Sequence, residues 1–409
     1  MSDDRRHPSA RWASRAARLN WAPPYPLGQW SRRCESLGVW DGDVIHLDIG
    51  SPDLPPPDSV IQALQSGEAA SADSRLGQGY SSFEQETPLR EAIARYYARR
   101  FDVSLDPETE IVPLLGSKEG IVLFSLASLD PDNVVLVTDP GYTPYQVGAR
   151  LAEANVVSIP LRPDLGFLPD LDGVPQETAD RARILWLNYP NNPTGAVAER
   201  GFFEKVVSFA RKHEMLVCHD APYSDVFYGL TPPRSILETP DASDVAVEFN
   251  SLSKTFNMAG FRVGMAVGNR DALHALAQLR SNTGSGMVVP VLSAAVAALS
   301  VDESWIAARN CLYAERMEIL APAIQSIGLQ VALPEATPYL WTKIPSGCTS
   351  EQFAIDLLER TGIAVAPGRF FGGRSDSYVR WSVTSPAGTI QAAAEHLERV
   401  GKTDTFERI

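Results

Sequence analysis

The sequence NSLSKTFNMAGFR, residues 250–262, is the stretch that decides how the fold of this chain is interpreted. Hydroxyl side chains flank Lys254 within it, and Arg262 follows eight residues later. A lysine amine can form a Schiff base with an aldehyde, while hydroxyl and guanidinium groups can hold a phosphate. The stretch therefore predicts a site for an aldehyde cofactor, with Ser251, Ser253 and Arg262 on its phosphate. A Ser-x-Ser-Lys sequence alone is more often a solvated turn, so the hypothesis depends on the rest of the chain.

The bulk composition indicates a soluble globular protein of two or three lobes. The chain has 409 residues, of which 44% are hydrophobic and 21% charged, enough for each lobe to bury a core. Its formal net charge is -14 with no long basic run, which argues against nucleic acid and anionic membranes as partners. No apolar run approaches the roughly 20 residues of a membrane span, and no secretory signal is recognisable. The four cysteines are far apart, so we expect a reduced, cytoplasmic protein without disulfides or a metal site.

Short apolar runs alternate with helical patterns from about residue 89 to 300. Each run is apolar or β-branched throughout, as expected for strands covered on both faces. A helical pattern such as residues 202–212 places its apolar side chains on one face. This alternation predicts an α/β domain with a largely parallel sheet. The expected strands are residues 134–137, 184–187, 215–219, 245–249 and 263–267.

The pattern changes after about residue 300 to that of an α+β lobe. Thr349 and Gln352 form a capping-box sequence that opens a helix to about residue 360, where Gly362 would end it. We expect the N-terminal 50 residues to join this lobe, which divides the chain into an arm with part of the small domain (1–47), a large domain (48–300) and a C-terminal small domain (301–409). The other elements expected are helices 305–326 and 387–400 and strands 329–333, 340–344, 363–366 and 378–383.

Chemically useful residues follow the expected strands, and ligands of open α/β sheets bind at the carboxyl ends of strands. The sequence GSKEG, residues 116–120, opens a helix, where backbone N–H groups and the helix dipole favour a phosphate. An ordinary turn is the alternative, and it is favoured for this sequence in isolation. Tyr142 follows the strand at 134–137 and can stack on a flat heteroaromatic ring. For Tyr145 we expect core packing.

An amide and an acid come after the next two strands. Asn192 lies in the proline-rich turn NYPNNPTG, which would hold its side chain at a fixed position, although the same sequence is also simply a good turn. Asp220 ends a buried strand, where an acid is costly unless paired. A protonated pyridine nitrogen would pair with it, and Tyr223 could reach the neighbouring phenolic oxygen; a structural salt bridge is the competing account. His219 faces the other side of the sheet and is expected to pack. Taken together, these features indicate pyridoxal phosphate.

With these motifs the chain resembles the class I and II aminotransferases, which are fold type I pyridoxal-phosphate enzymes. The resemblance covers roughly residues 22 to 400 and is most specific at 188–195, 220–223 and 250–264. Within the family, the chain is most similar to LL-diaminopimelate aminotransferases and related alanine-type or glutamate-type transaminases. The resemblance implies a large domain with a mostly parallel seven-stranded sheet, a smaller α+β domain and a homodimer. It also implies transfer of an amino group between an L-amino acid and a 2-oxo acid.

The resemblance also implies a role for individual residues, with Lys254, Asp220 and Tyr223 as the catalytic group. Lys254 forms the Schiff base with the cofactor and acts as the base at the substrate Cα. Around the ring, Asp220 pairs with the pyridine nitrogen, Asn192 and Tyr223 bond the phenolic oxygen, Tyr142 stacks on one face and Pro222 lies under it. The implied phosphate ligands are Ser117, Lys118, Ser251, Ser253, Arg262 and, from the neighbouring subunit, Tyr80.

Three residues are implied on the substrate side. Arg380 matches the arginine that clamps the α-carboxylate, a task that suits the two parallel donors of a guanidinium group. Gly50 lines the substrate site, and Asn192 contributes there as well as to the cofactor.

The chain departs from the family pattern at several positions. Gln85 stands where the family usually has glycine, five residues after Tyr80, and Gly284 stands where the diaminopimelate type usually has aspartate. The N-terminal segment is rich in tryptophan, which predicts burial against a partner subunit in preference to a roof over the substrate. These departures leave the substrate and the reaction type open. The tryptophans are Trp12, Trp21, Trp30 and Trp40.

Two other classes of function compete with transamination. A pyridoxal-phosphate lyase, or a β/γ-replacement or cyclising enzyme of specialised metabolism, would keep the cofactor and change the reaction. The aminotransferase-like module of a transcription regulator would need a DNA-binding domain. That module is disfavoured because the catalytic fold begins by about residue 45 of an acidic chain.

Overall fold

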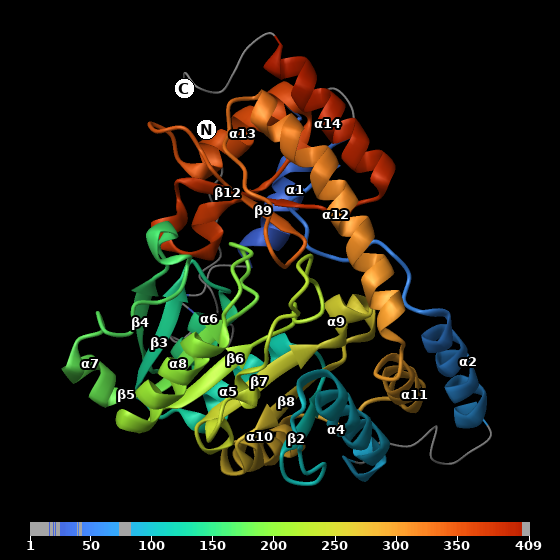
Figure 1. Ribbon diagram of the computed structural model, residues 1–409, viewed down its shortest axis with the longest axis vertical. Coiled ribbons are helices and arrows are strands. Elements are labelled where there is room, and N and C mark those ends of the chain that lie inside the picture. The colour runs from blue at the N-terminus through green and yellow to red at the C-terminus, as the bar shows by residue number, and fades with distance from the viewer. Residues whose placement is uncertain are drawn as a thin grey trace, which may run out of the picture.

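The computed structural model describes residues 16, 19, 21, 25–38, 40, 43–72 and 83–402. Figure 1 shows a large sheet with its helices in the lower part of the molecule and a smaller lobe above it. The long helix α12 (Glu303–Ser326) runs from the one part to the other. The predicted division at residues 47 and 300 stays a prediction.

The described residues form a seven-stranded sheet whose strand order is β2-β8-β7-β6-β5-β3-β4. The strands β3 to β7 pair in parallel, while β8 runs antiparallel to both of its neighbours. This confirms the predicted α/β class with a mostly parallel sheet. The strands are β2 (Ile111–Leu114), β3 (Val134–Asp139), β4 (Asn155–Pro160), β5 (Ala182–Asn188), β6 (Leu216–Asp220), β7 (Ala246–Ser251) and β8 (Gly264–Gly268).

Helices cover both faces of this sheet, which is why its central strands are mainly apolar and are buried along almost their whole length. In β5, Ile184 and Trp186 pack into the core beneath α5, whereas Leu185 and Leu187 pack into the core beneath α8. The helices of this part are α2 (Asp58–Ala72), α4 (Thr87–Phe101), α5 (Ser117–Ser128), α6 (Pro144–Leu151), α7 (Gln176–Arg181), α8 (Arg200–Lys212), α9 (Leu252–Thr255), α10 (Arg270–Thr283) and α11 (Val289–Ala298).

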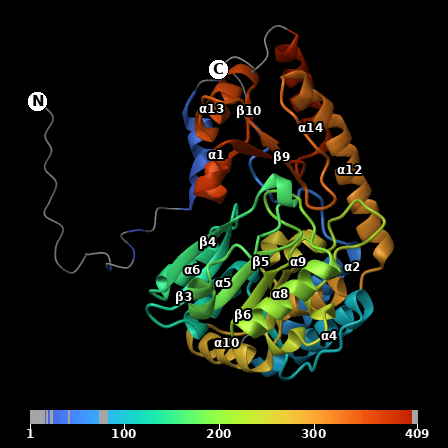
Figure 2. The ribbon, with the colours of Figure 1, turned by 60° about the vertical axis from the view of Figure 1, so that its left-hand side comes forward.

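The upper lobe combines the C-terminal elements with the described N-terminal helix. Its two small sheets have the orders β11-β12-β9, antiparallel, and β1-β10, parallel. Figure 2 shows α1 beside α13, where Arg33 pairs with Glu351. The elements are α1 (Pro26–Ser36), β1 (Ile45–His46), β9 (Tyr339–Lys343), α13 (Ser350–Thr361), β10 (Ile363–Ala364), β11 (Ala366–Pro367), β12 (Tyr378–Ser382) and α14 (Ala387–Gly401).

Local signals in the sequence mark the ends of α13. The Thr349 hydroxyl accepts from the backbone N–H of Gln352, whose side chain accepts from the backbone N–H of Thr349. Gly362 ends the helix with a φ of 74°, a conformation that glycine adopts without steric cost. The predicted capping box and the predicted stop are therefore both confirmed.

Three expectations about strands were wrong. In residues 329–333 only Leu329 is buried and Leu333 is exposed, no described strand lies beside them, and Pro334 follows directly. The expected strand 363–366 is divided between β10 and β11, which belong to different sheets because the chain changes partner at Val365. The edge strand β4 was not predicted because it is partly exposed and its sequence is not a fully buried apolar run.

The expectation of tryptophan burial against a partner is wrong for Trp30. Its indole N–H donates to the Val365 carbonyl at 2.8 Å, and its ring packs edge-on against Phe370 at 5.7 Å. Trp30 is 2% exposed and belongs to the core of the upper lobe. Trp12 lies outside the described residues.

No single helix among the described residues is long and apolar enough to cross a membrane. Taken together, α11 and α12 pass that test by length and composition, with an angle of 85° between them.

Candidate active site

A cavity of about 330 Å³ is lined by residues at and after the carboxyl ends of parallel strands, such as Asp220, and by Tyr339 and Arg380 of the upper lobe. Adjacent strands end together here, since Asn188 of β5 is in register with Asp220 of β6. Tyr80 is the one predicted site residue outside the described part of the chain. The predicted residues that line the cavity are Gly50, Ser117, Lys118, Tyr142, Asn192, Asp220, Pro222, Tyr223, Ser251, Ser253, Lys254, Arg262 and Arg380.

Asp220 presents one carboxylate oxygen with no partner among the described residues. The side chain is buried, and its Oδ2 accepts a hydrogen bond of 2.6 Å from the Tyr145 hydroxyl. The Oδ1 atom is buried and unpaired, and Asp220 lines the cavity. Burial raises the pKa of Asp220 to about 7, against the lowering effects of the Tyr145 hydrogen bond and the nearby His219. A protonated ring nitrogen would satisfy this oxygen, so the site fits a pyridine ring.

Tyr145 has a part in the site that the sequence did not reveal. Its ring packs in the core as predicted, stacked on Trp186 with centroids 4.9 Å apart. Its hydroxyl, however, holds the Asp220 carboxylate, 75 positions away in the chain. No local motif signals a contact of that separation.

Lys254 is half-buried in the single-turn helix α9 and lines the cavity. Its Nζ donates to the carbonyl of Gly50, and burial lowers its pKa. A lowered pKa increases the fraction of neutral amine, which is the nucleophilic and basic form. The Arg309 guanidinium fixes this turn by donating to the carbonyl oxygens of Lys254 at 2.5 Å and of Thr255 at 2.9 Å.

The predicted phosphate ligands converge at the start of α5, in a space that two glycines keep open. A Cβ at Gly116 would lie 2.2 Å from a guanidinium nitrogen of Arg262, and one at Gly264 would lie 2.6 Å from the Ser117 amide. The Arg262 guanidinium, the amide at the start of the helix and the nearby Lys118 ammonium form a cationic pocket in an acidic protein. Burial and the charge of Arg262 lower the pKa of Lys118. The arrangement suits a phosphate.

Ser251 and Ser253 are also drawn into this pocket by local structure. The Ser251 side chain caps α9 by accepting from the backbone N–H of Ser253 at 3.2 Å, and it donates to the Val263 carbonyl at 3.2 Å. The cap therefore places both serines beside Lys254 at the edge of the cavity.

The predicted carboxylate clamp, Arg380, already contacts other predicted residues. It donates to the Asn192 side-chain oxygen at 2.9 Å and to the Asp48 carbonyl at 2.8 Å. Because arginine only donates, the oxygen of Asn192 faces Arg380 and the amide NH₂ remains for another acceptor. The buried Nε of Arg380 has no partner among the described residues. A substrate carboxylate would fit these donors.

Tyr25 and Tyr339 line the cavity, although the sequence analysis named neither. The Lys118 ammonium lies 3.8 Å from the centroid of the Tyr25 ring, and Tyr339 contacts both Tyr223 and Arg380. Leu27, Asn188 and Ala259 line the same cavity.

The two departures from the family pattern lie near a buried ion pair. Gln85 belongs to the short 3-10 helix Phe83–Glu86, whose Glu86 carboxylate accepts two hydrogen bonds from Arg280 at 2.7 and 2.9 Å. Gly284 ends α10 in an extended conformation that any residue can adopt. Neither position lines the cofactor cavity.

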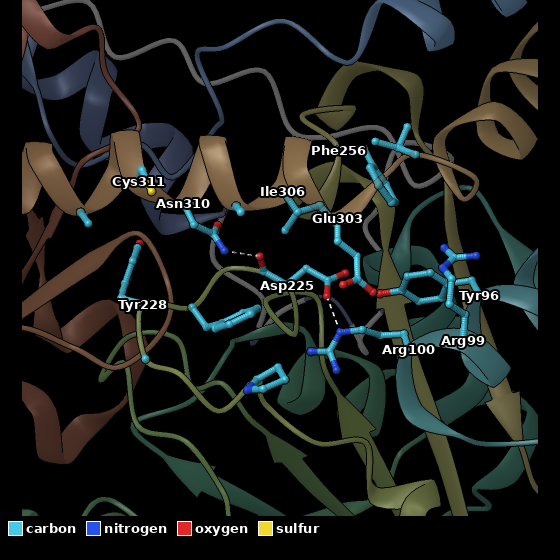
Figure 3. A pocket seen from close by; sticks show the side chains of 16 residues that line it. Tyr96, Arg99, Arg100, Asp225, Tyr228, Phe256, Glu303, Ile306, Asn310 and Cys311 are labelled. Atoms are coloured by element: carbon cyan, nitrogen blue, oxygen red, sulfur yellow. Dashed lines mark hydrogen bonds and ion pairs between the residues drawn. The ribbon is translucent and has the colours of Figure 1, made fainter.

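A second cavity, of about 420 Å³, adjoins the loop after β6 and contains none of the predicted residues. Figure 3 shows Asp225 between Arg100 and Tyr96 of α4 and Asn310 of α12. The carboxylate accepts from Arg100 at 2.8 Å and from Tyr96 at 2.5 Å, and the carbonyl accepts from Asn310 at 3.0 Å. These contacts hold the loop that carries Tyr223.

Comparison with known proteins decides the family. A model of the family described as aminotransferase class I and II matches residues 42–397. The chain belongs to the class I and II aminotransferases. This aminotransferase is 42% identical to an LL-diaminopimelate aminotransferase of Syntrophobacter fumaroxidans, over 94% of this chain and 98% of that protein.

Solved structures agree with that assignment. Substrate-bound BacF from Bacillus subtilis superposes with a TM-score of 0.88 at 32% identity, over 95% of this chain and 98% of the other. A probable N-succinyldiaminopimelate aminotransferase from Thermus thermophilus has a TM-score of 0.84 at 36% identity, over 91% of this chain and 98% of the other. This aminotransferase is therefore a fold type I enzyme that uses pyridoxal phosphate and moves an amino group between an L-amino acid and a 2-oxo acid. The names of its curated relatives give the lyase alternative no support.

Proposed function

We propose that this aminotransferase holds pyridoxal phosphate between Asp220 and Lys254 and orients the amino acid through Arg380. The unpaired buried oxygen of Asp220 carries the proposal, because Asp220 lines the same cavity as the Lys254 amine. A buried carboxylate oxygen without a partner is costly, and a protonated ring nitrogen offsets that cost.

The other cavity residues would hold the rest of the cofactor. Tyr142 and Pro222 would border the ring, while Asn192 and Tyr223 would donate to its phenolic oxygen. When bound, pyridoxal phosphate supplies a conjugated ring that accepts the charge developing on the substrate Cα. The phosphate would be bound by Ser117, Lys118, Ser251, Ser253 and Arg262.

Lys254 would move the proton. Its lowered pKa increases the fraction of neutral amine, the form that can take a proton from the substrate Cα. The Gly50 carbonyl accepts from Nζ and orients it in the cavity. Asp220, as a carboxylate, would keep the ring nitrogen protonated and in place. Arg380 would fix the α-carboxylate, which aligns the Cα–H bond with the lysine.

LL-diaminopimelate is the first donor that we propose, because curated relatives 39% to 42% identical to this chain carry that name. The test is to mix the cofactor-loaded enzyme with single amino acids and record the cofactor absorbance in each. A donor converts the cofactor to its amino form without an oxo acid, and a 2-oxo acid reverses the change. Release of pyruvate and ammonia from a cysteine conjugate, independent of any oxo acid, would contradict the proposal.

Replacing Arg380 with lysine is expected to raise KM for amino acids by about 10- to 100-fold. Lysine keeps the charge but loses the paired donors, and a charge-assisted hydrogen bond contributes about 1.5 to 3 kcal/mol. Steady-state kinetics with a fixed oxo acid measure the effect. Arg374 to lysine, at a position outside the cavity, is the matched control. An unchanged KM in the Arg380 variant would show that the carboxylate binds elsewhere.

We also propose a cytoplasmic homodimer in which Tyr80 of one subunit reaches the phosphate of the other. The resemblance to the family supports this assembly. Gel filtration of the active enzyme tests it, and a stable, fully active monomer would refute the role of Tyr80.

A further inference from the structure

Tyr339 lies between the cofactor side and the substrate side of the cavity. It is 2% exposed, and its hydroxyl oxygen lies 2.9 Å from that of Tyr223. The Arg380 guanidinium lies 4.1 Å from the centroid of its ring. One side chain thus contacts both the residue assigned to the phenolic oxygen and the residue assigned to the substrate carboxylate.

Strand pairing and a glycine together place the Tyr339 side chain between Tyr223 and Arg380. In the antiparallel pair of β9 and β12, Arg380 is opposite Trp341 and Ser382 is opposite Tyr339, so Tyr339 and Arg380 are diagonal neighbours on one face. A Cβ at residue 50 would lie 2.1 Å from the Tyr339 hydroxyl oxygen. Gly50 therefore makes room for the Tyr339 hydroxyl.

The number of hydroxyl protons determines the direction of the hydrogen bond. A tyrosine hydroxyl donates one hydrogen bond and accepts others. If Tyr223 donates to the phenolic oxygen of the cofactor, it has no second proton for Tyr339. The 2.9 Å contact then persists only with Tyr339 as the donor and the Tyr223 oxygen as the acceptor.

We propose that Tyr339 is a positioning residue whose hydroxyl directs the Tyr223 proton to the phenolic oxygen and whose ring holds the Arg380 guanidinium. This inference rests on the proposed function. A hydroxyl that accepts one hydrogen bond becomes a stronger donor in the next, so Tyr339 strengthens the bond from Tyr223 to the cofactor. Its ring face attracts the guanidinium, which fixes the clamp before substrate arrives.

The charges around Tyr339 make its hydroxyl a good donor. Burial acts to raise its pKa, but the positive charges of Lys254 and Arg380 bring the pKa below that of an ordinary tyrosine, and in the cofactor-free protein a hydrogen bond donated by Tyr223 lowers it further. The pKa of Tyr223 is raised well above the ordinary value by burial and by Tyr339. Further tyrosines with electrostatic contact to Tyr339 are Tyr25, Tyr142, Tyr228 and Tyr313.

The test separates the hydroxyl from the ring. In Tyr339→Phe the ring stays and the hydroxyl is lost, so the pH midpoint of the cofactor absorbance should rise by about 0.1 to 0.3 pH unit, the effect of a weakened hydrogen bond from Tyr223. The midpoint rises because the phenolic oxygen would receive a weaker hydrogen bond and would therefore keep more negative charge. That charge would hold the proton on the neighbouring Lys254 nitrogen more firmly. KM for the donor should stay within about twofold. Tyr339→Leu, which loses the ring too, should also raise KM by about tenfold.

A double-mutant cycle shows whether Tyr339 acts through Tyr223. Tyr223→Phe should shift the midpoint further than Tyr339→Phe, and adding Tyr339→Phe to it should cause no further shift. An equal shift in both backgrounds, or no shift from Tyr339→Phe alone, would overturn the proposal. Tyr189→Phe, which removes another buried hydroxyl, hydrogen-bonded to Phe167, is the control and should leave the midpoint unchanged.

The cofactor-free protein gives an independent measurement. Ultraviolet titration of wild type should show one tyrosine that ionises below the ordinary range, and Tyr339→Phe should abolish it. If wild type fails to bind pyridoxal phosphate, the proposed function is wrong. If wild type binds pyridoxal phosphate but Tyr339→Phe changes neither the pH midpoint of the cofactor absorbance nor the ultraviolet titration of the cofactor-free protein, only the role of Tyr339 is wrong.

Discussion

Replacing Lys254 with alanine is expected to lower the rate of transamination by about 10⁴-fold or more. General-base catalysis alone contributes roughly 10² to 10⁴, and the variant also loses the covalent attachment of the cofactor. Lys254 donates to the Gly50 carbonyl, whereas Lys118, the other lysine that lines the cavity, lies over the Tyr25 ring. Single-turnover absorbance with a good donor measures the effect directly.

Lys118→Ala is the matched control, since Lys118 lines the same cavity. Its loss should weaken cofactor binding, by about tenfold, and leave turnover of the saturated enzyme largely intact. Partial rescue of Lys254→Ala by a small primary amine would support the role of the lysine as a base. Appreciable transamination by Lys254→Ala without added amine would refute the assignment.

Replacing Asp220 with asparagine is expected to reduce turnover by about 10²- to 10⁴-fold. The amide has a similar shape but no charge, and breaking a buried ion pair costs about 3 to 5 kcal/mol. The ring nitrogen would lose its proton and with it much of its ability to accept charge. Turnover at saturating cofactor measures the loss, and activity near that of wild type would show that Asp220 does not pair with the ring.

The same variant should change how stability depends on pH. In the cofactor-free protein, burial raises the pKa of Asp220 from 3.8 to about 7, so the folded state binds more protons than the unfolded state between these values. The free energy of unfolding is therefore higher at low pH, where Asp220 is protonated in both states. It falls as the pH rises toward about 7, because the buried side chain must then lose its proton. The Tm of cofactor-free wild type should fall by a few degrees more across this interval than that of Asp220→Asn. Equal slopes would contradict the raised pKa.

The order of secondary structure was predictable because the signals are local. Strands covered on both faces give largely apolar runs, and five such runs correspond to β3, β5, β6, β7 and β8. The α13 cap depends on residues three positions apart. The edge strand β4 and the divided strand at residue 365 were not predictable, because their form depends on which strands lie beside them.

The sequence alone determined which residues gather at the cavity. Parallel strands end at a common edge, so residues that follow strands, such as Asn192, Asp220 and Lys254, meet there once the sheet forms. What each of them contacts was decided only by the tertiary structure. Tyr145 reaches Asp220 across 75 positions and Tyr339 reaches Tyr223 across 116, and contacts of such separation leave no periodic or local signal in the chain. Only the packing of the upper lobe on the sheet brings the second of these pairs together.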